Sequence, residues 1–143
     1  MVMKRFEIEH IGITVEEPVK MAQWYKKVMG FSIKLSSLND EGENSVAFLA
    51  DGKDRVLLEF GKISGVERLS SRIDHHLQFH IAVKSDDPDA DMKYLIDHGA
   101  TFIEICPVAM PGNRLIVLND PWGNCIQLVK RNSNIMEMKD QIV

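Results

Sequence analysis

The sequence predicts an α+β fold built from two βαβββ modules. Short apolar stretches alternate with turn-forming residues throughout the chain, and a set of landmark residues recurs at nearly constant spacing. The recurring landmarks lie 68 to 70 positions apart and are the pairs His10 and His80, Gly30 and Gly99, and Glu59 and Gln127. Chance could align one such pair but not readily three pairs in the same order, so we infer an internal duplication.

The first module, about residues 6–60, is predicted to begin with a strand over 8–15, where apolar residues mix with small or polar ones. Glu16, Glu17 and Pro18 then favour a helix start, because acidic residues and proline are typical of a first helical turn. Apolar residues follow at helical spacing, and Gly30 is typical of a helix end. Three further strands are predicted, over 31–38, 45–50 and 55–60.

The second module, about residues 75–131, repeats this pattern after a polar linker over 61–74 that is expected to hold one short helical turn. A strand is predicted over 77–83, followed by a helix that starts near Pro88 and stops at Gly99. The three remaining strands are predicted over 101–106, 114–118 and 124–130. A polar tail over 132–143, with a short helix, completes what we expect to be a single domain over residues 1–143.

Composition is that of an ordinary globular protein: 143 residues, of which 45% are hydrophobic and 27% charged. The formal net charge of -4 gives no electrostatic reason to expect binding to nucleic acid or to an anionic membrane. No apolar run approaches the roughly 18 residues that a transmembrane helix needs. Composition therefore gives no reason to expect a nucleic acid or a membrane as a partner.

The N-terminal stretch lacks the apolar core of a signal peptide, so the cytoplasm is the expected location. Cys106 and Cys125 are the only cysteines, and each lies in an apolar stretch. A disulfide would require the two strands to be neighbours, and a reducing cytosol argues against it. Two buried free thiols are the prediction.

The duplication places a histidine on the first strand of each module, His10 or His80, and an acid or its amide on the last, Glu59 or Gln127. Each of these residues alone has an ordinary interpretation: a strand histidine is more often a core or surface residue than a ligand, and Glu59 could face solvent. A charged carboxylate in an otherwise apolar strand needs a partner, however, because an isolated buried charge is costly. Two imidazoles and a carboxylate that converge on one divalent cation would supply it.

Several stretches resemble one known family, and the Asp-Pro-x-Gly-Asn turn at 120–124 is the most recognisable of them. The other stretches lie at 8–15, 22–31, 57–60, 79–83 and 125–128. Over nearly its whole length the chain resembles the vicinal-oxygen-chelate superfamily, which includes glyoxalases, bleomycin-resistance proteins and extradiol dioxygenases. The resemblance is specific for the fold and much less so for the reaction, because the family hosts many chemistries.

The resemblance implies two curved four-stranded sheets that form a cleft, within one chain or between two chains. It also implies one divalent metal ion (zinc, nickel, iron, cobalt or manganese) held by His10, Glu59, His80 and Gln127, and a homodimer. Gln127 departs from the family pattern, in which glutamate is usual. A glutamine can offer its carbonyl oxygen to a metal but cannot act as a base. The bound ion would keep about one more unit of positive charge, which weakens its retention and sharpens its Lewis acidity.

Three functions fit this site. The first is a metal-dependent lyase or isomerase, similar to lactoylglutathione lyase, that acts on a small substrate with vicinal oxygens and uses Glu59, the sole carboxylate of the proposed set, as base. Coenzyme-A-linked epimerases also resemble the pattern, but their amide and carboxylate occupy the opposite modules and no acid lies in 45–50 for their separate base. The second is a metal-independent protein that sequesters a drug or metabolite. The third, an Fe(II) ring-cleaving dioxygenase, is less favoured because Gln127 replaces its carboxylate.

Three further residues are candidate substrate contacts. Strand alternation would place Gln78 on the same face as His80. Trp122 precedes the last strand and would line the mouth of the cleft, although a packing role fits it equally well. Arg114 could hold an acidic group of the substrate, but a surface arginine that faces water is the simpler interpretation.

Overall fold

A computed structural model describes residues 2–108 and 110–140 of the chain. The chain divides into two compact units, Met1–Arg72 and Ile73–Val143. The boundary falls inside the predicted linker, so each predicted module is one compact unit. Residues 141–143 of the predicted tail lie outside the described residues, and the grouping of both modules into a single domain stays a prediction.

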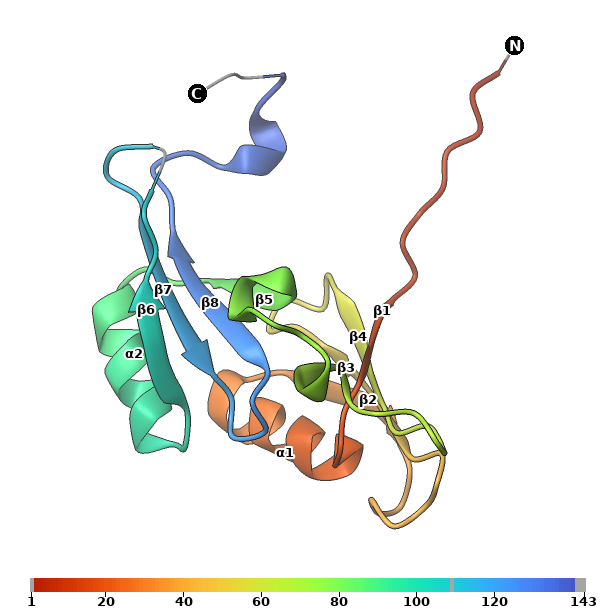
Figure 1. Cartoon of the computed structure of the whole chain (residues 1–143). Helices are drawn as coiled ribbons and strands as arrows, with labels where there is room; N and C mark the ends of the chain where they lie inside the picture. Colours follow the sequence, from red (N-terminus) through yellow and green to blue (C-terminus); the bar gives the residue numbers. More distant parts are fainter. Residues whose placement is uncertain (1, 109, 141–143) are drawn as a thin grey trace. The chain divides into compact units, whose positions relative to one another are not determined.

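The first unit contains one helix and a four-stranded mixed sheet (Figure 1). Its elements are β1 (Ile11–Thr14), α1 (Pro18–Met29), β2 (Ser32–Ser36), β3 (Val46–Ala50), β4 (Leu57–Gly61) and the short 3-10 helix η1 (Leu69–Ser71). The strand order is β1-β4-β3-β2. The first strand is parallel to β4, whereas the other neighbours are antiparallel.

The second unit repeats this topology. Its elements are η2 (His76–Gln78), β5 (His80–Lys84), α2 (Pro88–Asp97), β6 (Thr101–Ile105), β7 (Arg114–Asn119), β8 (Cys125–Lys130) and η3 (Ile135–Glu137). The strand order β5-β8-β7-β6 is the order of the first unit, again with the first and last strands parallel. The predicted α+β class and the duplicated βαβββ pattern are therefore confirmed.

Both helices begin and end where the sequence predicts. Pro18 and Pro88 occupy the first turns, where the fixed φ of proline suits the helix and its missing N–H is not needed. Gly30 ends α1 in the left-handed conformation with φ 72°, and its N–H donates to the carbonyl of Tyr25. At the end of α2 the cap is His98, and Gly99 follows with φ 101°.

The core of the first unit lies between α1 and one face of its sheet. Tyr25 from the helix is fully buried, and its ring centroid lies 5.4 Å from that of Phe60 on β4. Because side chains alternate along a strand, Leu58 and Phe60 face this core while Glu59 faces the other way. The second unit follows the same rule, with Ile126 and Leu128 buried beneath α2. The sheet face away from each helix is therefore the one that carries the polar donors.

Two predicted strands begin three residues before the observed ones, at 8 and not 11 and at 77 and not 80. Residues 2–10 have no regular structure and run away from the sheet (Figure 1), because β4 pairs with β1 only from Ile11 to Thr14. The strand predicted over 77–83 begins at His80, since residues 76–78 form η2. The side chain of Gln78 caps this turn by accepting the backbone N–H groups of Asp74 and His75, which competes with strand pairing.

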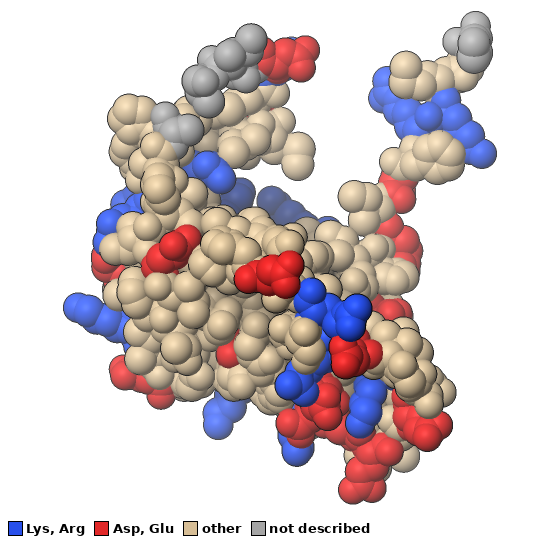
Figure 2. Space-filling view, in the orientation of Figure 1, with Lys and Arg blue, Asp and Glu red and all other residues tan. Residues whose placement is uncertain are grey.

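The surface carries charges of both signs. On the face drawn in Figure 2, Lys and Arg side chains lie among Asp and Glu side chains. In the first unit, Arg68 pairs with Glu16 at 3.0 Å and Arg72 pairs with Glu67 at 3.2 Å. No helix of the described residues is both long enough and apolar enough to cross a membrane.

The core of the first unit allows a test of stability. Phe60→Ala removes a fully buried ring and should lower the free energy of unfolding by about 3–5 kcal/mol. Leu38→Ala removes a fully exposed side chain of the same unit and should change it by less than about 0.5 kcal/mol. Urea unfolding followed by circular dichroism measures both, and equal losses would contradict the assigned packing.

Candidate metal centre

The histidine and the oxygen donor of each unit occupy equivalent places in the two sheets. In the first unit, Glu59 pairs with Gly12, two residues after His10. In the second, Gln127 pairs with Ala82, two residues after His80. Each unit therefore brings one imidazole and one side-chain oxygen together at the same register.

In the first unit, Nε2 of His10 lies 3.7 Å from Oε2 of Glu59, and each side chain is about one-third exposed, at 37% and 33%. The other ring nitrogen, Nδ1, is paired with the carboxylate of Glu9. This hydrogen bond, the largest cause, raises the pKa of His10 above its usual value, and the charges of Glu9 and Glu59 act in the same direction. With Nδ1 occupied, Nε2 is the nitrogen that faces Glu59.

The surroundings of Glu59 are small or apolar. A side-chain carbon at Gly12 or Gly61 would lie 3.6 Å from Oε1 of Glu59, so both glycines leave the carboxylate next to bare backbone. Phe48 is the partner of Glu59 across β3, and its ring meets the His10 ring edge-on at 5.5 Å. The first half-site therefore combines one carboxylate and one imidazole with an apolar wall.

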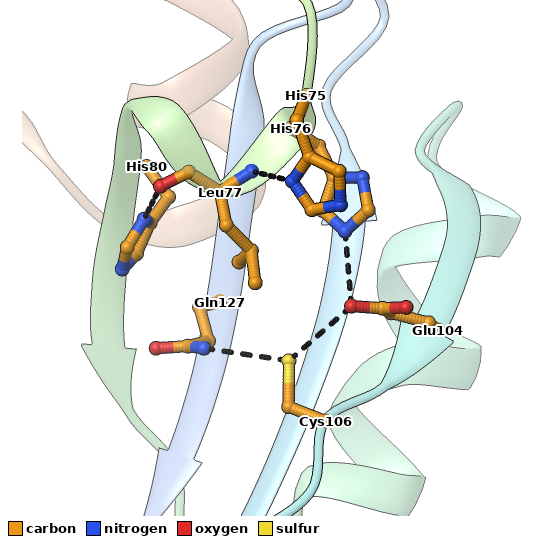
Figure 3. Close-up of polar contacts among 7 residues, drawn as sticks. All are labelled: His75, His76, Leu77, His80, Glu104, Cys106 and Gln127. Carbon is orange, nitrogen blue, oxygen red and sulfur yellow. Dashed lines mark hydrogen bonds and ion pairs between the residues drawn. The ribbon is translucent and has the colours of Figure 1, made fainter.

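In the second unit, Gln127 is buried and belongs to a chain of polar contacts (Figure 3). Its Nε2 donates to the sulfur of Cys106 at 3.8 Å, and the Cys106 thiol donates to Oε1 of Glu104 at 3.7 Å. That same carboxylate oxygen lies 3.0 Å from Nε2 of His76. His80 lies on β5, the strand that pairs with β8 (Figure 3), and its Nδ1 is bonded to the carbonyl of Leu77 at 3.2 Å, so Nε2 of this histidine too is left for a ligand.

The turn before β8 sets where this strand begins, and so where Gln127 lies in the sheet. Oδ1 of the buried Asp120 accepts the backbone N–H groups of Trp122 and Asn124, both at 2.9 Å. Gly123 adopts a φ of 84°, which glycine tolerates best. The recognisable Asp-Pro-x-Gly-Asn stretch is thus a structural device that starts β8, not a set of ligands.

Both cysteines are free and buried, as predicted. Burial is the largest cause that raises the pKa of Cys106, and burial raises the pKa of Cys125 to about 11. Both thiols are therefore neutral near pH 7. Neither has the lowered pKa that marks a reactive cysteine.

The structure places two of the four predicted ligands in each unit, on strands that pair with one another or directly before such a strand. Within residues 2–108 and 110–140, no three His, Cys, Asp or Glu side chains gather in a way that could hold a metal ion. Each unit by itself therefore offers two donors. In the second unit one of them is the amide oxygen of Gln127, which is not among these four residue types.

The three predicted substrate contacts have local partners. Gln78 lies in η2 and not on a strand, so the alternation argument that placed it beside His80 is wrong, and its amide oxygen accepts two backbone N–H groups. Arg114 makes a two-pronged pair with Asp89, with N–O distances of 2.9 and 2.6 Å. Trp122 is half-buried in the turn before β8. Their roles toward a substrate stay predictions.

Sequence reasoning missed three neighbours of the ligand pairs. Glu9 is one of them: residue 9 lies outside β1, and its carboxylate reaches the His10 ring. His76 is another: its side chain is only 21% exposed and pairs with Glu104. A charged residue among the apolar neighbours of 101–106 was the available signal for Glu104, by the argument that singled out Glu59.

These features coincide with a known family. The model of the Glyoxalase/Bleomycin resistance protein/Dioxygenase superfamily matches residues 7–128, so the chain belongs to this superfamily. No curated protein matches the chain significantly.

Solved structures support the same assignment of fold. A glyoxalase family protein from Enterococcus faecalis is 20% identical with a TM-score of 0.65, and the match covers 87% of this chain and 97% of that one. The fosfomycin resistance protein FosX from Mesorhizobium loti is 18% identical with a TM-score of 0.62, covering 94% and 97%. FosX from Listeria monocytogenes, in complex with Mn(II) and sulfate, is 15% identical with a TM-score of 0.62, covering 87% and 90%. At these identities the likeness shows the fold.

The pair formed by His76 and Glu104 gives a pH-dependent prediction. The His76 hydrogen bond is the first cause that lowers the pKa of Glu104 below its usual 4.5. A carboxyl with a lowered folded-state pKa stabilises the protein above about pH 4.5, and this contribution is lost as the pH falls through the folded-state value. His76→Ala should return the Glu104 pKa toward 4.5 in a carboxyl-carbon NMR titration. A Glu104 titration that is identical in both proteins would show that the pair does not form.

Proposed function

We propose that this protein is a metal-dependent lyase or isomerase of the glyoxalase-like kind that acts on a small substrate with vicinal oxygens. The observation that carries the proposal is the equal register of the two donor pairs, His10 with Glu59 and His80 with Gln127. Both pairs lie on the sheet face away from the helix, so packing against the helix does not dictate these residue types. Membership of the superfamily supports the same reaction class.

By donor type, the four predicted ligands suit a divalent first-row metal ion. Two imidazole nitrogens, one carboxylate and one amide oxygen suit zinc, nickel, iron, cobalt or manganese. Each histidine already has Nδ1 bonded, to Glu9 or to the carbonyl of Leu77, which is the usual way in which a ligating imidazole is oriented. The Mn(II) in one FosX structure shows that this fold can carry such an ion. When bound, the ion would supply Lewis acidity toward two adjacent substrate oxygens.

Glu59 is the candidate base in this proposal. The reaction needs a group that takes a proton from a carbon next to a carbonyl, and Gln127 cannot do so. Glu59 is the one carboxylate among the four side chains, and its carboxylate faces the His10 ring with one-third of the side chain exposed. To serve as a base it would exchange its role as ligand for that of proton acceptor.

A sequestering protein is the second candidate, because the neutral Gln127 weakens the charge of the donor set. Such a protein would bind a drug or a metabolite with no need for metal. An Fe(II) dioxygenase remains less favoured, since the carboxylate expected on the last strand is an amide here. In each case the proposed partner is a small molecule, and a homodimer in the cytoplasm stays the expected form.

Metal content tests the ligand set. Purified without a histidine tag, the wild-type protein should contain a stoichiometric transition metal, and chelation should lower its Tm. His10→Ala and His80→Ala should each lower metal content at least about tenfold with the fold intact, because each removes one ligand. His98→Ala is the matched control, since its ring bonds to the Tyr94 carbonyl beside α2.

Mass spectrometry measures the metal content, and thermal unfolding measures the Tm. Two results would count against the metal site. Normal metal content in both ligand variants would exclude the two histidines as ligands. A wild-type protein without metal, whose Tm responds to no added ion, would favour the sequestering protein, which should still bind its ligand in the presence of chelator.

The role of Glu59 has its own test. With metal at saturation, Glu59→Gln should slow the conversion of the hemithioacetal of methylglyoxal and glutathione by about 10²–10⁴-fold, the usual contribution of a general base. Glu9→Gln changes the carboxylate on the other side of His10 and should have a much smaller effect. If both variants lose activity equally, then Glu59 acts only on the local charge and not as the base.

A further inference from the structure

Gln127 has an asymmetric side chain at a position where orientation matters. Only the oxygen of a glutamine amide can bind a metal ion, because the NH₂ group has no free lone pair to donate. A half-turn about the last side-chain bond exchanges the two atoms. In Figure 3 the NH₂ group points to Cys106, and the oxygen points to the side on which His80 lies. Something must select this orientation over the reverse one.

The sulfur of Cys106 makes the selecting contact. Nε2 of Gln127 donates to it at 3.8 Å, whereas the amide oxygen accepts no hydrogen bond from the described parts of the chain, 2–108 and 110–140. A thiol can also donate, so Cys106 alone would tolerate the reversed amide. The orientation therefore depends on where the thiol proton goes.

Glu104 accepts a hydrogen bond from this thiol. Sγ of Cys106 lies 3.7 Å from Oε1 of Glu104, and a charged carboxylate is a stronger acceptor than a neutral amide oxygen. With its proton directed to Glu104, the thiol presents only sulfur lone pairs to Gln127.

Glu104 is held by the turn η2, which directly precedes His80. Nε2 of His76 lies 3.0 Å from Oε1 of Glu104, and the His76 ring stacks on His75 at 4.0 Å. Nδ1 of His75 accepts the N–H of Leu77, whose carbonyl in turn is bonded to Nδ1 of His80. Leu77 of η2 is thus bonded to both His75 and His80, and it connects the orientation of His80 with the polar chain that ends at Gln127.

We propose that Cys106, Glu104 and His76 are positioning residues that hold the Gln127 amide with its oxygen toward His80. None of the three is a metal ligand. The orientation itself follows from the contacts within the second unit, and its consequence for metal binding rests on the proposed function. In this way a neutral amide acts as a defined oxygen donor where the family usually has a carboxylate.

The first experiment reads the orientation without metal. In the metal-free full-length protein, ¹⁵N NMR resolves the two side-chain amide protons of Gln127. Cys106→Ala should shift the proton that is bonded to sulfur and speed its exchange with solvent. Cys125→Ala is the matched control, because it removes a second buried thiol of the same apolar cluster and should leave both protons unchanged. Amide signals that do not respond to Cys106→Ala would overturn the proposal.

The second experiment uses the symmetry of a carboxylate. In Gln127→Glu both terminal atoms are oxygens, so no orientation has to be selected. Cys106→Ala should raise the Kd for Mn²⁺ by about 10–100-fold in the Gln127 protein, the usual cost of losing a residue that orients a ligand. In the Gln127→Glu background it should change the Kd by less than about twofold, as expected for uncoupled sites. Electron paramagnetic resonance of free Mn²⁺ gives the Kd of the wild-type protein, the two single variants and the double variant.

The two experiments separate failure of the inference from failure of the proposed function. Equal loss of Mn²⁺ affinity in both backgrounds would mean that Cys106 supports the fold only, and the proposal would be wrong. If neither the wild-type protein nor Gln127→Glu binds Mn²⁺, the proposed metal centre is wrong. The NMR result then still decides whether Cys106 orients the amide.

Discussion

The parallel pairing of the first and last strand of each module is the constraint on which the rest of the structure depends. In both sheets the pairing has the same register, with Gly12 opposite Glu59 and Ala82 opposite Gln127. A parallel pair cannot be joined by a tight turn, and here the chain between the two strands contains a helix that crosses one face of the sheet and two further strands. That helix covers the apolar face and leaves the histidine and the oxygen donor together on the other.

The two units have diverged in chemistry on this common frame. In the first, the carboxylate of Glu59 lies among glycines and Phe48 and faces the imidazole of His10. The second unit keeps its carboxylate one step removed, at Glu104, and presents a neutral amide instead. A donor set with one negative charge holds a cation less firmly but leaves it a stronger Lewis acid. In the proposed metal centre, this division would suit chemistry at a substrate oxygen better than permanent storage of a metal.

Much of the fold could be predicted because its signals are local. Pro18 and Gly30 mark the helix ends through their own backbone preferences, and the period of two along a strand places Glu59 and Phe60 on opposite faces. The duplication then related the four candidate ligands across the chain. Strand ends were less predictable, because a strand extends only as far as its neighbour pairs with it. Residues 8–10 have strand-like residues but no partner on β4.

The fold class, the two modules and the equivalence of the donor pairs can be read from the amino-acid sequence, since they follow from periodicity and repetition. The surroundings of each donor emerge only when the strands are assembled into sheets. Cys106 and Gln127 are 21 residues apart and meet because β7 lies between β6 and β8 and brings their strands into one sheet. Glu104 and His76 are joined in the same way, by a turn and an edge strand. No local pattern records such contacts, because each depends on strand register and on side-chain direction at once.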